Sequence, residues 1–143
     1  MNKEDKILSA MIALILDVCL IWLLPYTVYK GFIYMILIVH LLFITNLYYN
    51  NKDLLDFLHI FVFLIPTLAI FIDDVNIVFI IVIFLSLLQV LWVNKGRCIL
   101  NGSDKTHWGF GNSVSYYTLY LNLFLAYKLG KLNFDPNSHQ LLK

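Results

Sequence analysis

The sequence predicts an all-α integral membrane protein, a polytopic bundle of four transmembrane helices followed by a fifth, C-terminal helix that is either spanning or interfacial. The 143-residue chain is 61% hydrophobic and 13% charged, whereas soluble domains are about 45–50% apolar and about 25% charged. A chain this short cannot bury such an excess in a soluble core. Its apolar residues also fall into long runs that are separated by short polar stretches.

The first two runs are residues 7–24, which end at Pro25, and residues 32–49, which follow Lys30 and Gly31. At a rise of about 1.5 Å per residue, each run can cross most of a hydrocarbon core of about 30 Å. The first run lacks a small-residue cleavage motif, so we expect an uncleaved helix rather than a signal peptide. Both runs are therefore predicted to span the membrane.

The third run, residues 54–72, contains Pro66. Proline has no N–H and its ring crowds the carbonyl four residues earlier, so a kink is expected where the carbonyl of Val62 is freed. The fourth run, residues 75–93, is nearly all Ile, Val, Leu and Phe. Strands usually end by about 10 residues, and this longer uninterrupted run therefore predicts a helix.

A loop at residues 94–112 leads to a last helical segment at 114–129 and a polar tail at 131–143. The last segment is short for a membrane span, but its leucines cover every face of a helix. This favours a spanning helix slightly over an interfacial one. Because no other stretch could bury a core of its own, residues 1–143 are expected to form a single transmembrane domain.

The distribution of basic residues predicts the orientation of the bundle. One side collects Lys3, Lys6, Lys52, Lys95, Arg97 and Lys105, and the opposite turns carry Lys30. The positive-inside rule then places the N-terminus and the long loop on the cytoplasmic, or matrix-like, side. Lys128, Lys131 and Lys143 weaken this bias if the last helix spans, which is the main argument for an interfacial helix. Abundant Ile, Phe, Tyr, Asn and Lys beside a lone arginine also suggest an AT-rich source genome.

Asp17 is the most informative polar residue, because a carboxylate in mid-helix costs about 2.5–3.5 kcal/mol on insertion scales. Ser9, Ala13 and Asp17 recur every four residues, so this face of the helix is small and polar and should pack against protein. His40 is about as far beyond the turn near Val28 as Asp17 is before it. We therefore expect an Asp17–His40 pair that acts either as a structural clamp, the favoured interpretation, or as a proton relay.

A second group of polar residues is expected on the cytoplasmic side. Asp53, Asp56 and His59 recur at the start of the third helix, and His107 lies in the long loop with Cys98 and Asp104. Such side chains can ligate metals, but their spacing matches no known ligand motif. Acidic residues also favour helix starts for electrostatic reasons. The sequence therefore predicts neither a metal nor a cofactor here.

These features favour a non-catalytic membrane protein, a structural or accessory subunit of a larger membrane assembly. The expected partners are the lipid bilayer and other membrane protein subunits. Nucleic acid is not expected, because the basic residues are scattered singly. The alternative is a small transporter or channel component that uses Asp17 and His40. A third possibility is a membrane-embedded enzyme acting on lipid or quinone through His59 and His107.

Overall fold

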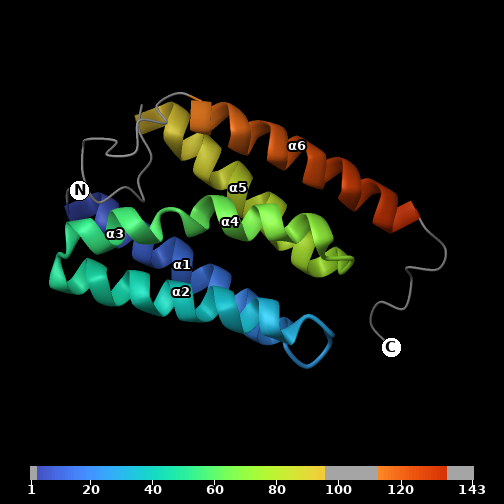
Figure 1. Cartoon of the computed structure of the whole chain (residues 1–143), viewed down its shortest axis with the longest axis horizontal. Coiled ribbons are helices and arrows are strands. Elements are labelled where there is room, and N and C mark those ends of the chain that lie inside the picture. Colours follow the sequence, from blue (N-terminus) through green and yellow to red (C-terminus); the bar gives the residue numbers. More distant parts are fainter. Residues whose placement is uncertain (1–2, 96–112, 135–143) are drawn as a thin grey trace.

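The computed structural model describes residues 3–95 and 113–134, and every regular element in these two ranges is helical. In chain order the helices are α1 (Lys3–Leu23), α2 (Lys30–Tyr49), α3 (Lys52–Leu58), α4 (Phe61–Leu68), the 3-10 helix η1 (Ala69–Phe71), α5 (Val75–Lys95) and α6 (Ser113–Phe134). They lie side by side in an elongated bundle (Figure 1). The predicted all-α class is confirmed.

Four helical stretches are long and apolar enough to cross a membrane: α1, α2, residues 53–71 and α5. Their outward faces remain apolar in the bundle, with Val18 and Leu41 about two-thirds exposed. Large apolar side chains on the outside suit a protein whose solvent is lipid. Helix α6 is less apolar and does not belong to this set.

Two helices extend well beyond their predicted apolar runs, by four residues at the start of α1 and five at the end of α6. Helix α1 already begins at Lys3, where Glu4 and Asp5 in its first turn interact favourably with the helix dipole. Helix α6 continues to Phe134 and carries Lys131 in its last turn, so residues 131–134 are helical rather than part of a polar tail. Polar residues at these ends extend the helices beyond the hydrophobic runs. Residues 96–112 and 135–143, which hold most of the predicted loop and tail, lie outside the described residues.

The third predicted helix is interrupted, but not where Pro66 would place the kink. Pro66 lies inside α4, and the interruption falls earlier, at His59 and Ile60. There the backbone forms tighter three-residue bonds, from Ile60 N–H to the Phe57 carbonyl and from Phe63 N–H to the Ile60 carbonyl. Near the proline, the hydroxyl of Thr67 donates to the Phe63 carbonyl at 2.6 Å. That carbonyl is next to the carbonyl of Val62, which is the one that Pro66 leaves without an N–H donor.

The helices pack around α1 and α5. Helix α1 contacts α2 and α5, and α6 contacts both α5 and α4. The larger core cluster lies between these helices and includes the fully buried Leu20, Ile33, Ile77 and Leu125. A smaller cluster around Leu55 joins α1, α2, α3 and α5 near the start of the chain. The polar contacts between helices lie among these apolar side chains.

Candidate functional site

The structure brings Asp17 of α1 and His40 of α2 into direct contact. The Oδ1 atom of Asp17 lies 2.5 Å from Nδ1 of His40, and the two side chains are only 15% and 12% exposed. With an ionised carboxylate, Nδ1 carries the hydrogen and Nε2 is the nitrogen left for any other partner. The contact joins the two arms of the α1–α2 hairpin at one depth. Each group thereby satisfies the other inside an apolar bundle.

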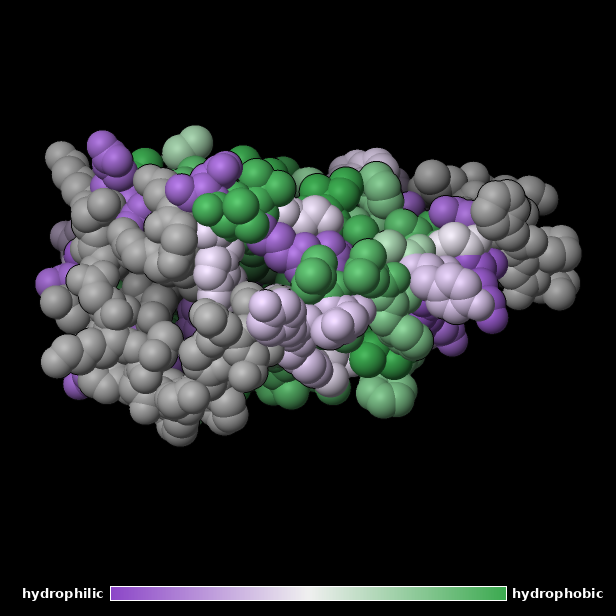
Figure 2. All heavy atoms as spheres, turned by 90° about the horizontal axis from the view of Figure 1, so that it is seen from above, coloured by the Kyte–Doolittle hydropathy of each residue, from purple (hydrophilic) through white to green (hydrophobic). Residues whose placement is uncertain are grey.

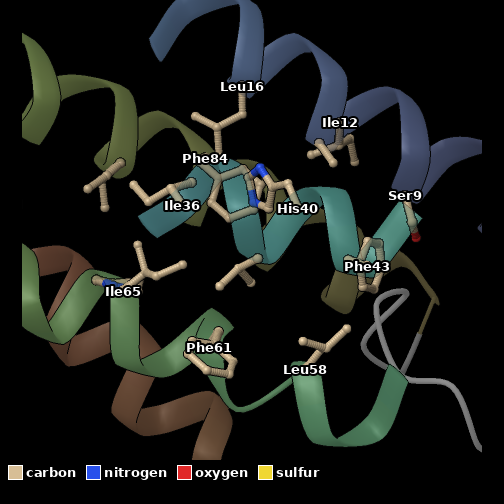
Figure 3. A pocket seen from close by; sticks show the side chains of 14 residues that line it. Ser9, Ile12, Leu16, Ile36, His40, Phe43, Leu58, Phe61, Ile65 and Phe84 are labelled. Carbon is tan, nitrogen blue, oxygen red and sulfur yellow. The ribbon is translucent and has the colours of Figure 1, made fainter. Parts of the chain in front are cut away.

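A small cavity lies beside this pair. Its volume is about 40 Å³, whereas sites for small-molecule ligands measure about 300–1,000 Å³. Apolar side chains from α1, α2, α4 and α5 form most of its wall, and Ser9 and His40 are the polar residues that line it (Figure 3). A space of this size with an apolar lining fits an apolar group no larger than about a methyl and offers a water molecule no polar partners among the described residues.

A polar contact between α5 and α6 was not predicted as a site. The side-chain amide of Asn122 donates from Nδ2 to Ser86 Oγ at 2.9 Å and to Gln89 Oε1 at 3.2 Å. Ser86 in turn donates to the Val82 carbonyl. Ser86 and Gln89 are three residues apart and therefore share one face of α5. Two polar residues three positions apart in one apolar helix, together with Asn122 in the next helix, are the sequence pattern that indicates this contact.

Helix α6 is also bonded to α4 through two hydroxyl groups. The oxygens of Thr67 and Tyr117 lie 2.6 Å apart. Because the hydrogen of Thr67 is already donated to the Phe63 carbonyl, Tyr117 must be the donor in this contact. The bond attaches α6 to the helix that contains Pro66.

Lys128 anchors α6 at the end of the bundle where the α1–α2 turn lies. Its Nζ donates to the carbonyls of Ile70 and Ile72 at 2.7 Å each and pairs with Asp73 Oδ1 at 2.8 Å. The carbonyls at the end of a helix lack partners within that helix. Lys128 supplies the missing donor where α4 and η1 end.

The neighbouring Asp74 connects the same region to the α1–α2 turn. Its Oδ2 accepts a hydrogen bond of 2.6 Å from the Thr27 hydroxyl. Its Oδ1 accepts the backbone N–H groups of Asn76 and Ile77 at 3.0 and 3.2 Å. Asp74 therefore caps the first turn of α5 and ties it to the preceding hairpin.

Of the polar group predicted on the cytoplasmic side, the structure describes Asp53, Asp56 and His59. Asp53 is exposed and Asp56 is buried, so the two do not share one environment although they are three residues apart. The ring of His59 stacks edge-on against Phe63, with centroids 5.4 Å apart. His107 lies outside the described residues, as do Cys98 and Asp104. Within the two described ranges, no group of three or more His, Cys, Asp or Glu side chains could hold a metal ion.

Asp5 and Ser9 are buried polar residues near the start of α1. The sequence pattern placed Ser9 on the face that packs against protein but did not identify Asp5. Both are fully buried in α1. They continue the row of Ala13 and Asp17 at four-residue spacing, so extending that row by one turn would have found Asp5. One face of α1 is thus small or polar from its first turn to its middle.

Comparison of the chain with protein-family models, with curated proteins and with solved structures found no match. The contacts of Asp17, Thr67, Asn122 and Lys128 share one property: each joins segments that are distant in sequence.

Proposed function

We propose that this chain is a non-catalytic, multi-pass membrane protein that serves as a structural or accessory subunit of a larger membrane assembly. One observation supports this most directly: polar side chains in the bundle and at its edge are used to hold one helix to another. The pairs are Asp17 with His40, Asn122 with Ser86, and Thr67 with Tyr117. Residues that serve a substrate have to present their polar atoms to it.

The proposed orientation has the N-terminus on the cytoplasmic or matrix-like side and α6 spanning the bilayer. Helix α6 extends over residues 113–134 and, at about 1.5 Å per residue, is long enough to span. Lys128 lies on the side where a positive charge weakens the positive-inside bias. Its ammonium group donates hydrogen bonds to two carbonyls and forms an ion pair with a carboxylate. A lysine held in this way is compatible with a spanning helix.

The assembly can be tested by native-gel electrophoresis after extraction from the source membrane with a mild detergent. We expect the chain to migrate with a fixed set of other membrane proteins, which mass spectrometry would identify at constant ratios. A harsher detergent that separates subunits provides the control. Migration of the chain as a monomer under the mild condition would contradict the proposal.

A second function, proton-coupled transport, is favoured by one specific observation. The His40 ring lines the cavity and is paired through Nδ1 with a carboxylate, which is how a proton-exchanging group can be held inside a membrane. The two functions differ in what the pair does. A clamp contributes to stability, whereas a relay contributes to flux through a protein that folds without it.

A further inference from the structure

Helix α6 has two opposite rows of side chains. The inner row, Thr118, Asn122 and Leu125, is buried against the bundle. The outer row, Tyr116, Tyr120, Leu123 and Tyr127, is exposed by 59–69%. Each outer residue is two positions from an inner one, which corresponds to about 200° around a helix. The two rows therefore point in nearly opposite directions.

The hydroxyl groups of the outer row need partners that lipid chains cannot supply. A hydroxyl without a hydrogen bond in hydrocarbon costs about 2–7 kcal/mol, depending on the reference state. Tyr117, which faces α4, has such a partner in Thr67. Within the described residues, the hydroxyls of Tyr116, Tyr120 and Tyr127 make no such bond. The side of the molecule that carries α6 accordingly mixes green apolar side chains with paler, more polar ones (Figure 2).

An aromatic belt at the headgroups does not account for the whole of this row, because Tyr120 and Leu123 lie between its two ends. Tyrosines in a belt gather at the two membrane interfaces. The outer row instead follows one line along α6 for about 16 Å, roughly half of a hydrocarbon core. Its spacing of four, three and four residues matches the seam by which two helices pack together.

We propose that the outer row is the interface with a second copy of this chain, in which the two α6 helices run parallel about a two-fold axis normal to the membrane. The inference rests on the proposed role as a subunit and names the first partner. Two copies with the same orientation bring each residue of such a row close to its own counterpart. The row must therefore be complementary to itself.

The residues of the outer row meet this requirement. A phenol hydroxyl both donates and accepts hydrogen bonds, so tyrosine can pair with tyrosine. Leu123 packs against leucine, and the row contains no charged side chain that would repel its copy. Aromatic side chains bury about 150–250 Å² each when fully covered. At the observed exposure the row offers at most on the order of 500 Å² per copy, so full coverage in a pair comes to roughly the 1,000 Å² at which specific interfaces begin.

The test is disulfide cross-linking in the native membrane, with Cys19 and Cys98 replaced by serine. Single cysteines are introduced by Tyr120→Cys and Leu123→Cys in the outer row. Leu41→Cys is the matched control, because Leu41 is equally exposed but lies on α2. We expect copper-phenanthroline to give covalent dimers at least ten times faster for the two α6 variants than for the control. Equal rates for all three variants would overturn the inference.

Native gels of the same membranes separate this inference from the proposed function. A larger complex whose α6 cysteines cross-link no faster than the control refutes the α6 dimer and leaves the subunit role intact. A cross-linked dimer without other proteins supports the dimer and refutes the accessory role. A monomer without cross-links refutes both.

Discussion

At the scale of single residues, Asp17 and His40 are not equivalent members of their pair. Losing His40 would strand a carboxylate between α1 and α2, which is the costly case for a buried charge. Losing Asp17 would leave an imidazole that can remain neutral, and interhelical hydrogen bonds in membranes average only about 0.6 kcal/mol. The two single replacements should therefore have different effects if the pair is a clamp.

We expect His40→Leu to lower the free energy of unfolding by about 3–5 kcal/mol and Asp17→Leu to lower it by about 1 kcal/mol. The double variant should return close to the original stability, because an apolar pair removes the stranded charge. Unfolding in mixed detergent micelles, followed by circular dichroism, measures these differences. Wild-type stability in all three variants, together with lost proton flux in liposomes, would instead support transport.

At the scale of elements, the stretch from α3 to η1 is connected to α6 by polar contacts near its end. His59 and Ile60 keep helical backbone dihedrals, so the interruption consists of changed hydrogen bonds rather than a sharp turn. Thr67 and Lys128 then connect the following residues to α6. Pro66 signalled that this helix was irregular. The proline could not locate the break, because the changed hydrogen bonds lie at His59 and Ile60, before the helical turn that contains Pro66.

Lys128 allows the contribution of this connection to stability to be measured. Lys128→Met keeps an apolar stem but leaves the carbonyls of Ile70 and Ile72 without their donor, which should cost about 1–3 kcal/mol. Lys131→Met is the matched control: Lys131 is exposed above the Tyr127 ring, and its loss should change stability by no more than about 0.5 kcal/mol. Thermal unfolding in detergent compares the two. Equal destabilisation would show that Lys128 acts through its charge alone.

At the scale of the whole molecule, the length and apolar character of the helices explain which features the sequence could predict. A span must be long and apolar, so four helical stretches were recognisable from composition. The contact of Asp17 with His40 could be anticipated because the two residues lie at nearly equal distances along the chain from the turn that joins α1 and α2. Lys128 and Asp73 are distant in sequence and share no turn, so only the packing of α6 brings them together. The burial of Asp5 was hidden for a similar reason, since it lies in a charged segment that looks exposed.

The arrangement of α6 also leads to a prediction about topology. Helix α1 begins at one end of the bundle and α6 ends at the other (Figure 1). If both span, epitope tags at the two termini must lie on opposite sides of the membrane. In sealed vesicles with the original external face outward, we expect added protease to remove the C-terminal tag and spare the N-terminal one. Permeabilised vesicles, which should lose both tags, are the control.

The predicted external C-terminus has to be reconciled with the positive charges on α6, because the positive-inside rule disfavours lysines on the external side. Lys128 is 15% exposed and bound by two carbonyls and Asp73, so it acts as an internal contact rather than a free loop charge. The remaining basic residues of the sequence are more numerous on the N-terminal side, where Lys6 bonds Asn50 at the surface. Protection of both tags would mean that α6 returns to the cytoplasmic side or lies in the interface. An interfacial α6 would let its tyrosine hydroxyls bond the headgroups, so they would need no second copy of the chain as a partner.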